Sequence, residues 1–94
     1  MWYEAPDGRI RATRHGDLRL KEGNWTVAEY ERARSGRQYV QRDAARVYIH
    51  RTRGGRLHVI IEGEQGVVTA HKNLRNIDGL ARSYGWVEVI EGND

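Results

Sequence analysis

Two runs of strand-forming residues separated by a glycine pair constrain the fold of this chain more than any other feature. Residues 47–53 contain Val47, Tyr48, Ile49 and Thr52, residues 56–62 contain Val59, Ile60 and Ile61, and Gly54-Gly55 lies between the two runs. A glycine pair suits a two-residue turn because glycine readily adopts the positive φ that such turns need. We therefore predict a β-hairpin here, and with it an antiparallel sheet.

Turn and cap signals divide the rest of the chain into further strands and two helices. Thr26 and Glu29 form a capping-box pattern and Gly36 fits a C-cap, so we predict a helix over residues 26–35. Apolar residues recurring at helical spacing predict a second helix over residues 74–84, which ends at a glycine. Strands are predicted over residues 9–13, 18–21, 67–71 and 86–90. Residues 37–46 fit either a helix extension or a strand.

These elements predict the α+β class, an antiparallel β-sheet with two helices packed on one face, in the order of about β-β-β-α-β-β-β-α-β. The 94 residues are expected to form a single domain, 1–94. The absence of cysteine excludes disulfides and thiolate metal sites. No apolar run approaches the roughly 20 residues of a membrane span, and the N-terminus lacks the features of a signal peptide. We therefore expect a cytoplasmic protein with no membrane partner, of bacterial or phage type.

Positive charge is concentrated in the middle of the chain. Between residues 32 and 56 there are eight arginines and one acid, which gives that segment a net charge of +7. The flanking segments are weakly acidic, and the whole chain carries +3. Arginine grips phosphate through its planar, bidentate guanidinium group. The clustering predicts a polyanionic partner, RNA or DNA.

The register of the hairpin assigns side chains to faces. A two-residue turn pairs Arg53 with Arg56, Arg51 with His58 and Ile49 with Ile60. One face is then the expected core, and it carries Tyr48, His50, Thr52, Leu57, Val59, Ile61, Val68 and Ala70. The other face is apolar at one end and basic at the other, and it carries Val47, Ile49, Ile60, Val67, Arg51, Arg53, Arg56, His58, Thr69 and His71.

The basic end of that second face is the predicted site. RNA cleavage without a metal needs a base, an acid and cations beside the phosphate, roles that histidine and arginine can fill. His58 and His71 are the candidate base and acid, Arg51 or Arg56 the charge stabiliser, and Thr69 an orienting group. No metal ligands or cofactors are predicted.

A wider set of side chains is predicted to bind nucleic acid. Tyr39 is a candidate platform for stacking an unpaired base, because it lies between arginines in the sequence. The predicted binding residues are Arg37, Arg42, Arg46, Arg51, Arg53, Arg56, Lys72 and Tyr39.

Residues 47–86 resemble the HicA-type mRNA interferase toxins. The similar motifs are Gly54-Gly55-Arg56-Leu57-His58, Val67-Val68-Thr69-Ala70-His71 and Leu80-Ala81-Arg82-Ser83-Tyr84-Gly85-Trp86. The resemblance implies an α-β-β-β-α fold like that of double-stranded-RNA-binding domains, RNA as substrate and His58 as the catalytic histidine. Residues 56–71 also resemble endoribonuclease toxin domains of the barnase and EndoU kind. A toxin of this type would have a cognate antitoxin or inhibitor protein as a partner.

Two other functions remain open at this point. Residues 8–33 are similar in topology to the three-stranded-sheet DNA-binding domains of the integrase-arm kind, which implies a non-catalytic DNA- or RNA-binding accessory protein of a phage or mobile element. The chain could instead be a protein-interaction module. In that case the apolar end of the basic face, Val47, Ile49, Ile60 and Val67, would be the contact patch.

Overall fold

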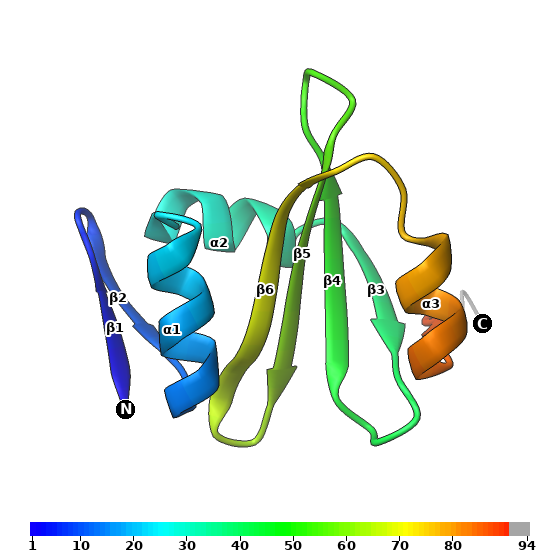
Figure 1. Ribbon diagram of the computed structural model, residues 1–94, viewed down its shortest axis with the longest axis horizontal. Coiled ribbons are helices and arrows are strands. Elements are labelled where there is room, and N and C mark those ends of the chain that lie inside the picture. The colour runs from blue at the N-terminus through cyan, green and yellow to red at the C-terminus, as the bar shows by residue number, and fades with distance from the viewer. Residues whose placement is uncertain (91–94) are drawn as a thin grey trace.

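The computed structural model describes residues 1–90, which form a two-stranded sheet, a five-stranded antiparallel sheet and three helices (Figure 1). The α+β class predicted from the sequence is confirmed. None of the helices formed by residues 1–90 has the length and apolar composition needed to cross a bilayer.

The chain begins with a hairpin of β1 (Trp2–Ala5) and β2 (Gly8–Arg11), joined by a short turn at Pro6 and Asp7. In that turn the carboxylate of Asp7 accepts hydrogen bonds from the backbone N–H groups of Val27 and Ala28, at 2.7 and 3.0 Å. These two bonds tie the hairpin to the start of the second helix. They also hold the pKa of Asp7 below its ordinary value.

The segment predicted as a strand over residues 18–21 belongs instead to helix α1 (Arg14–Glu22), so that prediction is wrong. The hydroxyl of Thr13 caps the helix by accepting a hydrogen bond from the backbone N–H of Gly16 at 3.0 Å. Leu20 is fully buried on the inner side of the helix. Alternation over four residues is too short to distinguish a strand from one helical turn, and the cap decides in favour of the helix.

The predicted helix over residues 26–35 is confirmed as α2 (Val27–Arg34). Thr26 and Glu29 form both hydrogen bonds of the capping box. The C-cap is Ser35 rather than Gly36. Gly36 has a different role, because a Cβ at this position would lie 2.0 Å from a carbonyl oxygen of the adjacent strand.

The large sheet has the strand order β6-β5-β4-β3-β7, and every neighbouring pair is antiparallel. Its strands are β3 (Arg37–Val40), β4 (Arg46–Arg51), β5 (Leu57–Gly63), β6 (Gly66–Leu74) and β7 (Val87–Glu88). The ambiguous residues 37–46 are therefore a strand followed by a connecting loop and the first residue of β4.

The central hairpin exists as predicted, but its register is displaced by one residue. Arg51 pairs with Leu57 and Ile49 pairs with Val59, so each partner on β5 lies one residue earlier than expected. Because side chains alternate along a strand, this displacement moves every β5 side chain to the face opposite the one predicted.

The displacement arises in the turn, which holds three residues, 53–55, rather than two. The backbone N–H of Thr52 donates to the carbonyl oxygen of Arg56 at 2.8 Å, and the N–H of Gly55 donates to the carbonyl oxygen of Thr52 at 2.9 Å. Gly55 has a φ of 81°. This is the three-residue hairpin loop that closes with one residue in the left-handed region. The predicted pairing of Arg53 with Arg56 does not form.

An apolar cluster covers each face of the sheet. The first cluster contains Tyr3, Ile10, Ala12, Leu20, Trp25, Ala33, Tyr48, Ile60, Val67 and Ala70. The second contains Val47, Ile49, Leu57, Val59 and Ile61. Val47, Ile49, Ile60 and Val67, the predicted contact patch, are 0–6% exposed and lie inside these clusters. The exposed patch needed for a protein-interaction module is therefore not formed by these residues.

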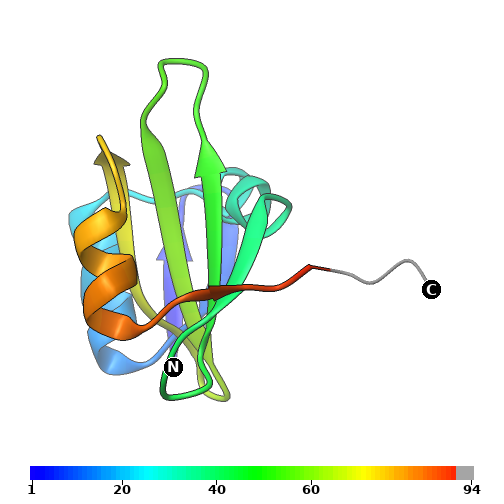
Figure 2. The ribbon, with the colours of Figure 1, turned by 90° about the vertical axis from the view of Figure 1, so that its right-hand side faces the viewer.

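Helices lie over both faces of the sheet. Helix α1 packs against β6 and α2 against β4 and β5, on the side of the first cluster. Helix α3 (Asp78–Tyr84) is flanked by Ile77 and Trp86, which pack on the second cluster. Figure 2 shows α3 and β7 on the near side of the molecule and α1 with the N-terminal hairpin on the far side. The two helices that share a face are thus α1 and α2.

The last helix is shorter than predicted. The sequence predicts a start at residue 74, whereas β6 extends through Leu74 and α3 begins at Asp78. The helix ends as predicted at Gly85, which has the left-handed φ of 65°. The final strand, predicted over residues 86–90, is the two-residue strand β7.

Candidate nucleic-acid interface

Five arginines from separate segments of the chain gather at one end of the large sheet. Arg37 begins β3, Arg51 ends β4, and Arg53 and Arg56 flank the glycines of the hairpin loop. Arg75 directly follows β6. We call this group the arginine end of the sheet. Four of the five are exposed and Arg56 is half-buried.

The antiparallel register brings these residues together. Arg37 lies opposite Ile49, two residues from the end of β4, and Arg51 lies opposite Leu57. Leu57 in turn lies opposite Leu74, the last residue of β6. One end of the sheet therefore brings together the start of β3, the end of β4, the hairpin loop and the end of β6.

None of the five cations of the arginine end has an acidic partner among residues 1–90, and the same is true of Arg42 and Arg46 at the opposite end. Ion pairs of 2.8–3.3 Å join basic to acidic side chains at five other places: Arg9 to Glu4, Arg19 to Glu22, Lys21 to Asp17, Arg34 to Glu62, and Lys72 to Glu29. Within residues 1–90, no arginine of the arginine end makes such a pair. Their positive charge is left to act on an external anion.

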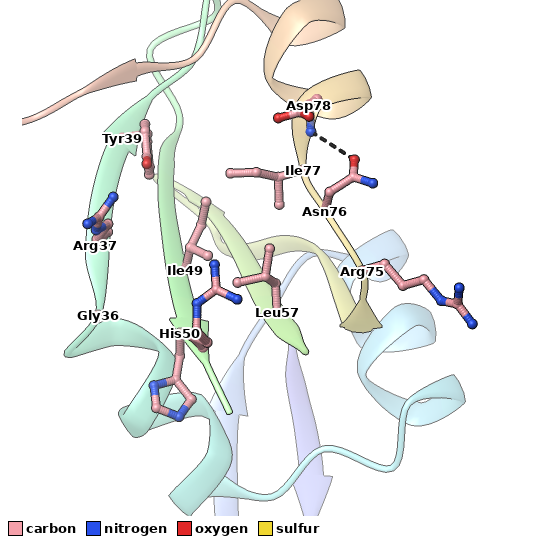
Figure 3. A pocket seen from close by; sticks show the side chains of 11 residues that line it. Gly36, Arg37, Tyr39, Ile49, His50, Leu57, Arg75, Asn76, Ile77 and Asp78 are labelled. Carbon is pink, nitrogen blue, oxygen red and sulfur yellow. Dashed lines mark hydrogen bonds between the residues drawn. The ribbon is translucent and has the colours of Figure 1, made fainter. Parts of the chain in front are cut away.

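A pocket of about 390 Å³ opens beside the arginine end, on the face of the second cluster (Figure 3). Figure 3 shows the apolar side chains of Ile49, Leu57 and Ile77 pointing toward one another across it, with Arg37 on β3 at its side. The guanidinium of Arg75 points outward, away from the pocket. The complete lining is Gly36, Arg37, Tyr39, Ile49, His50, Arg51, Leu57, Arg75, Asn76, Ile77 and Asp78.

Asp78 is the only acid among the lining residues, against three arginines. Its backbone N–H donates to the Oδ1 atom of Asn76 at 3.3 Å, which fixes the side chain of Asn76 at the start of α3. On the other side, the guanidinium of Arg51 donates to the carbonyl oxygen of Gly55 at 3.3 Å. That bond holds Arg51 against the hairpin loop.

A second, shallower hollow of about 460 Å³ adjoins the pocket. It is lined by Gly54, Gly55, Arg56 and Arg75. Because Arg75 lines both hollows, they form one continuous basic surface from β3 to the hairpin loop.

His58 and His71 do not lie on the same face of the sheet, so the prediction that they are cross-strand neighbours is wrong. His58 lies on the side of the first cluster, where its ring meets the ring of Trp25 edge-on at 5.5 Å. Its Nε2 atom is 3.2 Å from Oδ1 of Asn73. The residue directly opposite His58 on β4 is His50. The two histidines that face each other are therefore His50 and His58.

His71 and Thr69 lie on the other side of the sheet, opposite Val59 and Ile61 respectively. His71 is half-buried, and burial lowers its pKa, with a further lowering from the charge of Arg19. Neither residue lies at the arginine end, because Thr69 and His71 pair with the middle of β5.

The arginines predicted to bind nucleic acid are divided between the two ends of the sheet. Arg46 begins β4, and Arg42 lies in the loop before it, so both belong to the end opposite the arginine end. Arg42 donates to the carbonyl oxygen of Ser83 at 3.5 Å. The predicted surface that combined these arginines with Arg51 and Arg53 is therefore split.

Lys72 and Tyr39 are both engaged within the fold. The ammonium of Lys72 is 2.8 Å from a carboxylate oxygen of Glu29 and lies over the ring of Trp25. Tyr39 is half-buried, packs against Trp86 at a ring-centre distance of 6.1 Å and lines the pocket. Its place is thus in the pocket wall rather than on an open surface.

Sequence reasoning did not single out Arg75, Asn76 or Asp78. A strand extended to Leu74 would have placed Arg75 beside the hairpin loop, because β6 is antiparallel to β5. The predicted strand ends at residue 71, because the apolar residues from Leu74 onward recur at helical spacing and indicate a helix.

Residues 1–90 contain no group of three or more His, Asp or Glu side chains arranged to hold a metal ion. Comparison with known proteins finds no family model, no curated protein and no solved structure that matches this chain.

Proposed function

We propose that this protein binds nucleic acid, with RNA as the expected ligand, through the arginine end of the sheet. The observation that carries the proposal is the convergence of Arg37, Arg51, Arg53, Arg56 and Arg75 without an acidic partner among residues 1–90.

Like charges gathered at one end of the sheet repel one another and lower the stability of the fold. A bound anion would offset that repulsion. Five cations contributed by four segments match an extended chain of phosphates better than a single small anion. Arginine is also the side chain best suited to phosphate, since its fork donates two parallel hydrogen bonds.

A matched pair of double variants tests this proposal. Arg51→Gln with Arg53→Gln removes two charges from the arginine end, while Arg42→Gln with Arg46→Gln removes the same charge from the opposite end. Fluorescence anisotropy with a labelled RNA measures affinity. The first variant is expected to bind about tenfold more weakly or worse, and the second nearly as tightly as the wild type. Equal losses in the two variants would show that net charge alone is responsible.

Metal-independent RNA cleavage is the second candidate function, and the pairing of His50 with His58 favours it. Both histidines are close to the arginine end in sequence, since Arg51 directly follows His50 and Arg56 lies two residues before His58. Burial, together with the charges of Arg32 and His58, lowers the pKa of His50, which favours the neutral form of its imidazole. A neutral imidazole can accept the proton of a 2′-hydroxyl.

In this scheme His50 takes the 2′-hydroxyl proton, the 2′ oxygen bonds to phosphorus, and the bond from phosphorus to the 5′ oxygen breaks. His58, oriented by Asn73, delivers the proton that the departing 5′ oxygen needs. The products are a 2′,3′-cyclic phosphate and a 5′-hydroxyl.

Incubation with labelled RNA in excess EDTA, read on a denaturing gel, tests cleavage. The variants His50→Gln and His58→Gln should each lose cleavage and keep RNA affinity, whereas His15→Gln, on α1, should keep both. Cleavage that survives in both of the first two variants would exclude this pair.

A further inference from the structure

The pocket beside the arginine end combines an apolar floor with a cationic rim. Ile49 and Leu57 are 6% and 7% exposed, and Ile77 closes the pocket from the side of α3. Arg37 and Arg51 line the same pocket, with Arg75 at its outer edge. A fully hydrated ion would leave the apolar floor unused, and a purely apolar ligand would leave the guanidinium groups without partners.

The size and polar groups of the pocket narrow the ligand further. A volume of about 390 Å³ lies in the range of roughly 300–1,000 Å³ that is usual for small-molecule sites. The start of α3 adds an amide at Asn76 and a carboxylate at Asp78, which can donate to and accept from the polar edge of a ring. A planar, partly apolar ring attached to a phosphate satisfies all three parts of the site.

We propose that the pocket receives one unpaired base, so that the nucleic acid bound at the arginine end is single-stranded. This inference rests on the proposed function. The base would lie against Ile49, Leu57 and Ile77, and its phosphates would follow the rim toward the hollow formed by Arg56 and Arg75. In a duplex the same base is stacked and paired, so it cannot enter a pocket.

Three labelled probes of equal length separate the parts of this proposal. They are a single-stranded RNA, the same RNA as a duplex, and a single strand carrying abasic sites, which keeps the phosphates and removes the bases. The proposal predicts that the single-stranded RNA binds about tenfold more tightly than either of the other two. All three should release with rising salt.

Two other outcomes overturn the inference in different ways. If the abasic strand or the duplex binds as tightly as the single-stranded RNA, the pocket does not take a base, although the arginine end still binds phosphates. If none of the probes binds, the proposed function fails together with the pocket.

An Ile77→Ala variant tests the pocket itself. Ile77 precedes α3 and is half-buried, so truncation removes part of the pocket wall. Affinity for the single-stranded RNA should fall about fivefold, while affinity for the abasic strand stays the same. The unchanged abasic affinity also shows that the variant is folded. Leu18→Ala, at a 52% exposed position on α1, is the matched control and should change neither affinity. Equal losses for both probes in Ile77→Ala would contradict a base-binding role.

Discussion

At the scale of single residues, surroundings rather than residue type decide what each cation or histidine can do. Lys72 is neutralised by Glu29 and covered by Trp25, so a lysine that the sequence suggested for phosphate binding serves the fold. His71 lies beside Val59 in the middle of β5, outside the arginine end, and is half-buried. Its lowered pKa comes first from burial and then from Arg19.

That lowered pKa predicts a loss of stability in mild acid. An unfolded histidine titrates near a pKa of about 6.5. Above this pH His71 is neutral in both states and has no effect, but as pH falls below it the unfolded chain binds the proton first. His71→Gln should therefore lose less unfolding free energy between about pH 7.5 and about pH 5.5 than the wild type does. Urea unfolding at the two pH values measures the difference. His50 contributes with the same sign, so part of the loss should remain. An unchanged pH dependence in the variant would contradict the burial of His71.

At the scale of elements, the hairpin loop determines which side chains share a face. Thr52 and Gly55 close a three-residue loop, and the left-handed φ of 81° at Gly55 is the feature that the loop requires. Gly54 has no such requirement, because its φ is not positive and a Cβ there would meet only the hydroxyl of Thr52, at 3.9 Å.

The two glycines should therefore respond differently to substitution. Gly55→Ala is expected to lower the unfolding free energy by about 1 kcal/mol, since a left-handed φ is unfavourable for a residue with a Cβ. Gly54→Ala should change it by less than about 0.5 kcal/mol. Thermal or urea unfolding of the two variants measures both. Equal destabilisation would indicate a two-residue loop with two positive φ values, and with it the register that the structure excludes.

Close packing of α1 on β6 gives a second prediction at this scale. A Cβ at Gly16 would lie 1.8 Å from the carbonyl oxygen of Val67, whereas a Cβ at Gly79 in α3 would meet nothing within 4 Å. Gly16→Ala should lower the unfolding free energy by about 2 kcal/mol or more, because the helix must move off the strand. Gly79→Ala should raise it by about 0.5 kcal/mol through helix propensity. Stability retained in Gly16→Ala would show that α1 does not pack as described.

Local signals predicted the elements better than their arrangement. The capping box at Thr26 and the left-handed glycine at Gly85 are contained in a few neighbouring residues, and both predicted helix ends are observed. The register of the hairpin depends on one residue in a loop that contains two glycines, and either choice satisfies the local pattern. The arginine end was predicted in part, because Arg51, Arg53 and Arg56 adjoin the loop in sequence. Arg75 was missed because only the pairing of β5 with β6 brings it there.

At the scale of the whole molecule, the two ends of the large sheet differ in their charged groups. Helices α1 and α2 complete the core on one face, while the short α3 covers the second cluster and leaves a pocket at the arginine end. At the opposite end of the sheet, Arg46 shares a hollow with the acids Glu62 and Glu64, and Arg42 lies in the loop before β4. This asymmetry favours the arginine end as the surface that binds a polyanion.

The salt dependence of RNA affinity tests this account most directly. Each phosphate contact with a single strand contributes about 0.7 to the slope of log affinity against log salt concentration. The wild type should show a steep negative slope, and Arg75→Gln should reduce its magnitude by about 0.7, whereas Arg42→Gln should leave it unchanged. A shallow wild-type slope, or the same reduction in both variants, would contradict phosphate binding at the arginine end.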